Sequence, residues 1–83
     1  MSIDKKVKHF HKLIGENVKR IREDKGFSQR ALSLAIGQES TSIISQAELG
    51  KGKHFNIEQL YKISEELNVE FCEFFKDHKP PTV

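Results

Sequence analysis

Residues 28–50 read SQRALSLAIGQESTSIISQAELG and predict two short helices joined by a tight turn. Ser28 is suited to cap the first of these helices, because its hydroxyl can accept a hydrogen bond from a free backbone N–H. Leu32 and then Ala35 or Ile36 follow at spacings that place them on one helical face. Gly37 then predicts the end of the helix, since glycine readily takes the left-handed conformation that a helix C-terminus often needs.

The second helix of this stretch carries an uncharged polar face. Ser40 is its cap candidate, Ile44 and Ala47 continue the apolar face, and Gly50 ends the helix. The polar positions between these residues are Thr41, Ser42, Ser45 and Gln46. Uncharged hydrogen-bonding side chains are suited to reading base edges in the major groove of duplex DNA. Ile43 has two open interpretations, contact with a thymine methyl group or burial against the loop that follows.

The segments on both sides extend the pattern. Residues 14–29 read IGENVKRIREDKGFSQ, residues 56–69 read NIEQLYKISEELNV, and residues 70–75 read EFCEFF. In this order the pieces resemble the helix-turn-helix of the phage repressor and Cro superfamily, also called the Xre family of bacterial and phage regulators. The resemblance covers about residues 14–75. It implies an all-α fold, a compact five-helix repressor-like (lambda-repressor-type) DNA-binding domain.

The resemblance also implies which residues contact DNA and which join two copies of the chain. The bases are expected to be read by Thr41, Ser42, Ser45 and Gln46. The DNA backbone is expected to be bound by Gln29, Arg30, Lys51, Lys53 and His54. The dimer interface is expected to contain Phe71, Phe74 and Phe75. This Phe-Phe ending is similar to that of restriction-modification controller proteins, a compact branch of the family.

Several of these positions carry more specific expectations. Gln46 can make a bidentate contact with adenine, and we expect it to contribute most to sequence choice. Gln29 is expected either to brace a side chain of the second helix or to bond a phosphate. The loop of residues 50–55 reads GKGKHF, and its two glycines leave it free to follow a phosphate backbone. Glu48 is expected to make a structural bond near the helix end rather than a DNA contact.

The turn between the two helices departs from the family pattern. The stretch from Gly37 to Gly50 is one residue longer than the commonest family spacing, and we place the extra residue at positions 38–39. In this register Ser40 caps the second helix, worth about 1 kcal/mol, and Ile44 falls in the core. An alternative register moves the base-reading set by one residue.

The N-terminal region has a helical pattern of apolar residues. The residues that recur at steps of three and four are Ile3, Val7, Phe10, Ile14, Val18 and Ile21. They predict a first helix from near Asp4 to Lys25. The competing interpretation is a frayed basic tail, because Gly15 costs about 1 kcal/mol relative to alanine inside a helix. We expect a basic extension of the first helix over residues 1–12, a Cro-type helix-turn-helix domain over residues 13–77 and a disordered tail over residues 78–83.

Charged and titratable residues of the first helix give weaker signals. Lys19, Arg20 and Arg22 lie among acidic residues and predict an exposed face with local ion pairs worth about a few tenths of a kcal/mol each. His9 and His11 form an H-x-H pair, but residues two apart on a helix do not face each other. Other metal ligands are missing at recognised spacings. We therefore expect solvated histidines, no metal site and no cofactor.

Composition limits the functional classes. The net charge of +2 over 83 residues is too small for a uniformly basic coat, yet residues 1–25 hold eight Lys or Arg against four acids, while acids outnumber bases in residues 54–83. This asymmetry predicts one face suited to phosphates. One cysteine excludes an internal disulfide framework. The sequence has no run of about 18 apolar residues and no apolar block at its start, so we expect a cytoplasmic protein without a membrane partner.

Together these features predict a sequence-specific double-stranded DNA-binding transcriptional regulator, and no enzyme. We expect a homodimer on a palindromic operator, with one recognition helix in each of two major-groove half-sites about one helical turn apart. Repression by occlusion is expected over activation. The alternative is an antitoxin or protein-interaction module of the same fold, with a protein partner and weak DNA binding. A steep fall of DNA affinity with salt distinguishes the first function from the second.

Overall fold

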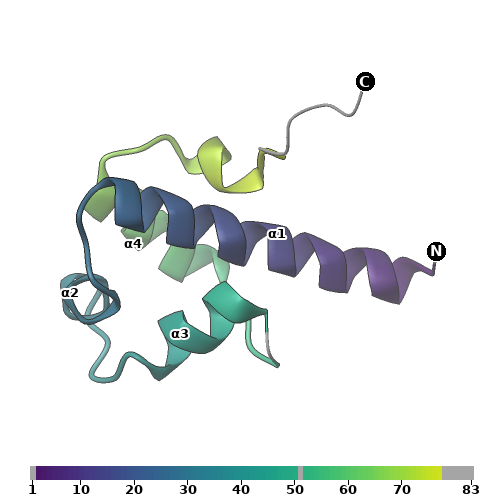
Figure 1. Ribbon diagram of the computed structural model, residues 1–83, viewed down its shortest axis with the longest axis horizontal. Coiled ribbons are helices and arrows are strands. Elements are labelled where there is room, and N and C mark those ends of the chain that lie inside the picture. Colours follow the sequence, from purple (N-terminus) through teal and green to yellow (C-terminus); the bar gives the residue numbers. More distant parts are fainter. Residues whose placement is uncertain (1, 51, 78–83) are drawn as a thin grey trace.

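The computed structural model describes residues 2–50 and 52–77, and all of its regular secondary structure in these ranges is helical (Figure 1). The elements are α1 (Ile3–Asp24), α2 (Gln29–Ala35), α3 (Ser42–Leu49), α4 (Ile57–Leu67) and the 3₁₀ helix η1 (Phe71–Phe75). The all-α prediction is confirmed. Lys51 and the tail of residues 78–83 lie outside the described residues.

The fifth helix differs from the prediction, because it is a 3₁₀ helix of five residues rather than an α-helix. Asn68 ends α4 in the left-handed conformation, and the backbone is extended at Glu70 and again at Lys76. The interval between these residues is too short to stabilise an α-helix on its own. The domain therefore has four α-helices among its described residues.

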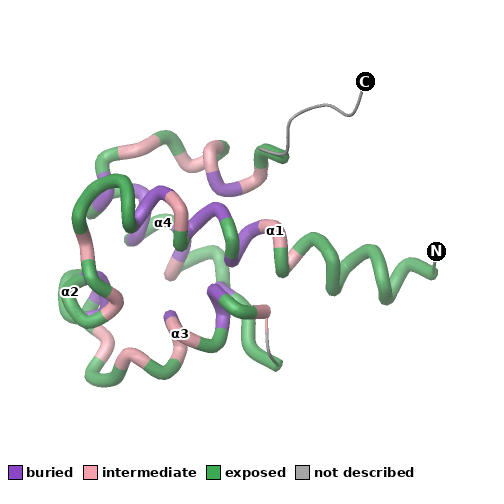
Figure 2. Tube along the Cα trace, in the orientation of Figure 1, coloured by how far each residue is buried: buried purple, intermediate pink, exposed green. Residues whose placement is uncertain are grey.

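Helix α1 is a single helix of 22 residues, capped by the hydroxyl of Ser2, which accepts a hydrogen bond from the backbone N–H of Lys5. It begins one residue before Asp4 and ends one residue before Lys25, as the apolar spacing predicts. Its first turns extend beyond the body of the molecule, where the chain is exposed (Figure 2). The frayed-tail interpretation of these residues is not supported.

Gly15 allows α1 and α3 to cross at short range. A Cβ atom added at Gly15 would lie only 2.2 Å from the carbonyl oxygen of Ala47. Ala47 is itself almost fully buried. The sequence alone predicts that Gly15 weakens the first helix, and this prediction is incomplete. The glycine costs helix propensity, but it lets the backbone of α3 approach α1.

Local signals set the ends of α2. The Ser28 hydroxyl accepts a hydrogen bond from the Ala31 backbone N–H at 3.0 Å, which confirms the predicted cap. Gly37 has φ +82°, and the N–H of the next residue donates to the Ser33 carbonyl at 2.8 Å. This bond satisfies a free carbonyl at the helix end. The predicted stop at Gly37 is confirmed.

The start of α3 was predicted one residue too early. Thr41, not Ser40, occupies the N-cap position, and its own side chain makes no capping bond. The Ser40 hydroxyl instead accepts from the backbone N–H of Ser42 at 3.1 Å and lies 2.8 Å from the Ser42 hydroxyl. This short-range turn satisfies the first N–H of α3. Ile44 is fully buried, so the predicted register of the apolar face is confirmed.

The core lies where the four α-helices and η1 meet. Its fully buried large residues include Leu32, Ile44, Ile63, Leu67 and Phe74. Helix α4 begins with a capping box, in which the Asn56 side chain accepts from the backbone N–H of Gln59 and the Gln59 side chain accepts from the backbone N–H of Asn56. The core therefore fixes the position of α3 relative to the other helices.

Asn17 joins η1 to α1. Its side-chain nitrogen donates to the carbonyl oxygens of Phe74 at 2.8 Å and Lys76 at 2.7 Å. The ring of Phe74 is fully buried in the core, whereas Phe71 and Phe75 are half-buried. Phe74 therefore has no surface to offer a second copy of the chain. The predicted dimer interface keeps only Phe71 and Phe75.

Candidate nucleic-acid interface

Helix α3 has one side in the core and the other toward solvent. Ile44, Ala47 and Glu48 are buried. Ser42 and Gln46 are exposed, and Thr41 and Ser45 are half-buried. Because Ser42, Ser45 and Gln46 are spaced by three and four residues, they share one helical face. The predicted base-reading residues therefore form one uncharged polar surface, with Thr41 at the N-terminal end of the helix.

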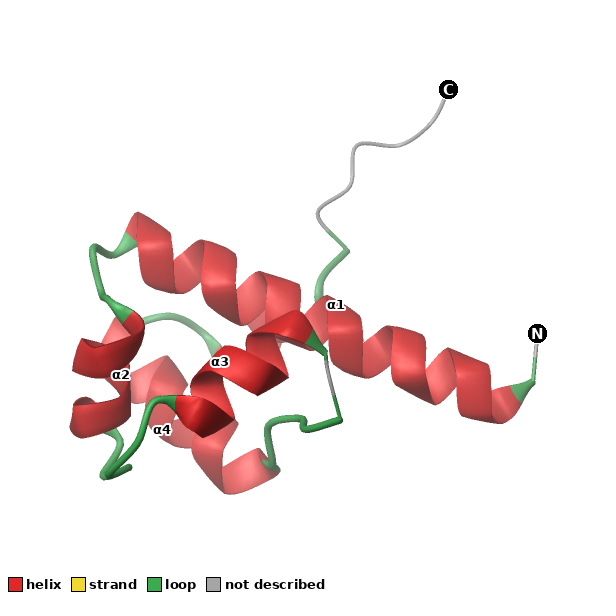
Figure 3. Cartoon of the chain, turned by 60° about the horizontal axis from the view of Figure 1, so that its bottom comes forward, coloured by secondary structure: helices red, strands yellow, loops and turns green. Residues whose placement is uncertain are grey.

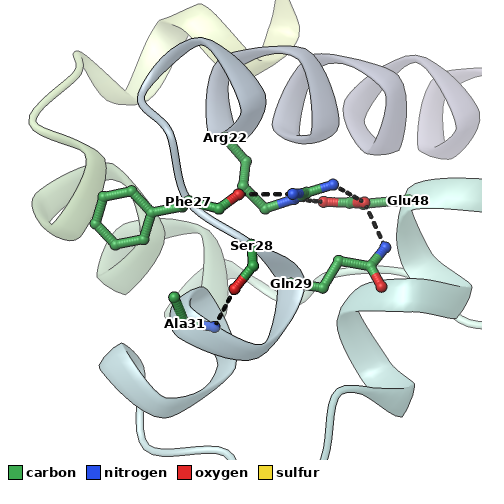
Figure 4. A network of polar contacts seen from close by, with 6 residues as sticks. All are labelled: Arg22, Phe27, Ser28, Gln29, Ala31 and Glu48. Carbon is green, nitrogen blue, oxygen red and sulfur yellow. Dashed lines mark hydrogen bonds and ion pairs between the residues drawn. The ribbon is translucent and has the colours of Figure 1, made fainter.

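Glu48 anchors the opposite side of α3 through a buried ion pair (Figure 4). The Arg22 Nε donates to Glu48 Oε2 at 2.7 Å, and Arg22 Nη2 donates to Glu48 Oε1 at 3.1 Å. Arg22 Nη1 also donates to the carbonyl of Phe27 at 2.7 Å. A planar guanidinium and a carboxylate match in this bidentate arrangement, which compensates for the loss of water around both charges.

Gln29 completes this network from the first turn of α2. Its Nε2 donates to Glu48 Oε1 at 3.0 Å. Of the two roles expected for Gln29, the structure shows the bracing of a residue in α3. The same amide nitrogen has a second hydrogen, and a phosphate contact through it stays a prediction. The carboxylate of Glu48 thus connects α1, α2 and α3.

Two outcomes follow for the charged residues of the sequence. The structural bond expected of Glu48 is confirmed. Arg22 was wrongly placed on an exposed face of the first helix, because it is only 6% exposed and faces α3. The position of Arg22 in the helix could have indicated its burial. Arg22 follows the fully buried Val18 by four residues and therefore lies on the same face of α1.

The predicted backbone-binding residues lie on either side of α3. Arg30 is exposed near the start of α2 and lines a shallow hollow with residues 38–41 of the turn before α3. Lys53 and His54 are exposed in the loop that follows α3. Figures 1 and 3 show α3 between α2 and this loop. Lys51, the remaining candidate, lies outside the described residues.

His54 has a partner that the sequence did not reveal. Its ring stacks on that of His11, with the ring centroids 3.9 Å apart and the planes inclined by 17°. His11 is half-buried, so the expectation of a solvated side chain was wrong for it. Burial lowers the pKa of His11, and the nearby charge of His54 lowers this pKa further. The stack joins α1 to the loop after α3, a tertiary contact without a local sequence signal.

Two further observations concern ligands and membranes. Within residues 2–50 and 52–77, His, Cys, Asp and Glu form no group of three or more that could hold a metal ion. The helices of this described part include none that is both long and apolar enough to cross a bilayer.

Comparisons with known proteins agree with the arrangement of α2 and α3. A family model described as helix-turn-helix matches residues 18–74, which is more than half of the chain. A search of curated proteins gives no match. The matched region begins within α1 and includes both helices of the motif, α4 and most of η1. The chain therefore belongs to the helix-turn-helix family of Xre and Cro type.

Proposed function

We propose that this protein is a sequence-specific double-stranded DNA-binding transcriptional regulator and that α3 is its recognition helix. The observation that carries the proposal is the division of α3 into two sides. Its apolar side and Glu48 are buried, whereas an uncharged polar face reaches solvent. A helix fits the major groove, where such side chains can distinguish base pairs. We assign the protein no catalytic activity and place it in the cytoplasm.

Selectivity for the DNA sequence is assigned to the exposed face of α3. The Gln46 amide can donate to and accept from adenine at the same time. Thr41 and Ser42 stand at the N-terminus of the helix, where hydroxyls and free backbone N–H groups can meet base edges or phosphates. The bonds from Arg22 and Gln29 to Glu48 hold α3 in place before DNA arrives. This preorganisation reduces the entropy that binding would otherwise cost.

Affinity is assigned to residues on either side of α3. Arg30 lies before the recognition helix, and Lys53 and His54 lie after it. Lys51 belongs to the same loop by sequence. Each cation that neutralises a phosphate releases condensed counterions, so binding of this kind weakens as salt rises. These contacts position the protein but carry no sequence information.

Binding as a homodimer to a palindromic operator is the second part of the proposal. Phe71 and Phe75 are half-buried on η1, and the ring of Phe75 stacks on Phe10 with centroids 6.0 Å apart. Phe10 keeps 45% of its surface exposed, so this apolar surface continues along α1. A two-fold dimer would place recognition helices about one helical turn of DNA apart. Occupation of a promoter by such a dimer would repress transcription.

Selection of bound sequences from a random duplex pool tests the proposal. We expect a palindromic motif with half-sites about ten base pairs apart. Binding to the selected duplex should also weaken steeply with salt. A folded protein that enriches no motif would overturn the proposal and would favour a protein-binding role for this domain.

A further inference from the structure

The first turns of α1 carry three lysines on one side of the helix. Lys5, Lys8 and Lys12 follow one another at steps of three and four residues, and all three are exposed. We call these residues the lysine strip. Within the described ranges, none of them forms an ion pair with a carboxylate. Asp4 shares a hollow with Lys8, and Glu16 shares another with Lys12, but neither carboxylate comes within ion-pair distance of these lysines. The three positive charges therefore have no evident role in stabilising the fold.

The lysine strip faces the chain that leaves the recognition helix. Its three side chains line a shallow hollow together with His9 and Gly50, the residue that ends α3. A neighbouring hollow is lined by Lys8, by His11 and by the loop residues Lys53 and His54, with Asp4 as its only acid. Lys8 and Gly50 belong to both hollows, so the two form one continuous surface.

Three contacts fix this surface relative to α3. A Cβ atom added at Gly50 would lie 3.5 Å from the Cβ of Lys12, which shows that the end of α3 packs directly on α1. The rings of His11 and His54 stack at 3.9 Å. Phe55, the next residue of the loop, is buried in the core. The strip therefore keeps a fixed position beside the recognition helix.

The dimensions of the strip suit a DNA backbone. Lys5 and Lys12 are seven residues apart, which corresponds to about 10 Å along an α-helix. One strand of duplex DNA places about three phosphates within that distance along its axis. Lys53 adds a fourth positive charge from the adjoining loop.

We propose that the lysine strip and Lys53 form a phosphate-binding surface that extends the DNA contact of this protein beyond the recognition helix. The proposal rests on the proposed function, because duplex DNA is the ligand that would lie against the end of α3. It assigns a role to the N-terminal turns of α1, which precede the residues matched by the family model. The phosphates concerned flank the bases that α3 reads.

The test compares a triple variant with the unchanged chain. Lys5→Ala, Lys8→Ala and Lys12→Ala are combined, and affinity is measured at several salt concentrations for the selected duplex and for an unrelated duplex. Each lost phosphate contact should reduce the salt slope by about 0.9, so we expect a reduction of about two to three. The loss of affinity should be similar for both duplexes. Alanine favours helices, and circular dichroism verifies that α1 is retained.

Lys6 provides a matched control. It is exposed on the same turns of α1 but lines neither hollow. Lys6→Ala should leave the salt slope unchanged, whereas Lys8→Ala alone should lower it by about one. Ethylation interference should also show that the triple variant loses phosphate contacts at the flank of the site and keeps those nearer its centre.

The outcomes separate this inference from the function on which it rests. If the unchanged chain selects a motif but the triple variant keeps its salt slope, the lysine strip does not bind phosphate and the proposed function stands. If the unchanged chain selects no motif, the proposed function fails and this inference fails with it.

Discussion

The guanidinium of Arg22 in α1 and the carboxylate of Glu48 in α3 form a buried ion pair, with Nε and Oε2 2.7 Å apart. The two residues are 26 positions apart in the sequence. Their contact holds the inner side of α3 against α1, and Gln29 adds the start of α2 to the same carboxylate. The contacts of Glu48 on the buried side of α3 therefore fix the orientation of the opposite, polar face that is proposed to read DNA.

Removal of Glu48 should strongly destabilise the domain. Glu48→Ala leaves the Arg22 guanidinium buried without its partner charge, which typically costs about 3–5 kcal/mol. Urea denaturation measures the loss as a change in the free energy of unfolding. Lys62→Ala is the control, because it removes an exposed ion pair with Glu58 and should change stability by less than about 1 kcal/mol. Similar small losses in both variants would show that the buried pair does not stabilise α3.

Gly15→Ala should also be destabilising, although alanine favours helices. The new methyl group would meet the Ala47 carbonyl at 2.2 Å and would push α3 away from α1. Overpacking typically costs about 1–3 kcal/mol, which exceeds the gain of about 1 kcal/mol in helix propensity. Thermal unfolding should therefore show a lower midpoint. Glu16→Ala, at the adjacent exposed position, should show no such loss. A more stable Gly15→Ala variant would contradict the close helix crossing.

Gln46→Ala should relax sequence selectivity at one base pair in each half-site. Loss of a bidentate contact typically removes about 1–3 kcal/mol of discrimination. Selection from a random duplex pool, repeated with the variant, measures this change. Lys53→Ala provides the contrast, because it should weaken binding across all sequences and lower the salt slope by about one. Uniform weakening by Gln46→Ala would show that Gln46 does not read a base.

The stack of His11 and His54 should make the folded state sensitive to acid. The folded-state pKa of His11 is lowered by burial and by the charge of His54, so the unfolded chain binds the His11 proton more readily. The stabilisation is complete above the unfolded pKa of about 6.5 and is lost as the pH falls through the lowered folded value. The other charged residues that line the same hollow as His11 are Asp4, Lys8 and Lys53.

The free energy of unfolding, measured from pH 8 to pH 5, tests the role of His11. The unchanged chain should lose more stability across this interval than His11→Ala. His9→Ala is the control, because His9 is exposed and lies on another side of the helix from the stack. Identical pH profiles for the unchanged chain and His11→Ala would contradict the coupling of the two rings.

The features that the sequence predicted correctly depend on neighbouring residues. Ser28 and Asn56 cap their helices through bonds to the residue three positions later. Gly37 and Asn68 end helices by adopting positive φ. These local signals, with apolar spacing, were sufficient to place four α-helices. The predicted start of α3 was one residue early because Ser40 and Thr41 are both suitable cap residues.

The features that the sequence did not reveal depend on tertiary packing. Arg22 had the appearance of a surface charge, because its partner Glu48 lies on another helix. From the sequence, Gly15 is expected to weaken α1. Its role in allowing the backbone at Ala47 to come close to α1 depends on a contact with another helix. The sequence predicts Phe74 as an interface residue, but its ring is fully buried in the core. In each case the neighbour that decides the role is distant in the sequence.

Amide chemical shifts, followed by NMR as the selected duplex is added to isotopically labelled protein, test the central claim most directly. If α3 is the recognition helix, the largest changes should occur at residues 41–46, with further changes at residues 29–30 and 52–54. Changes confined to α4 and η1, with α3 unaffected, would contradict the account and place DNA on a different face of the domain.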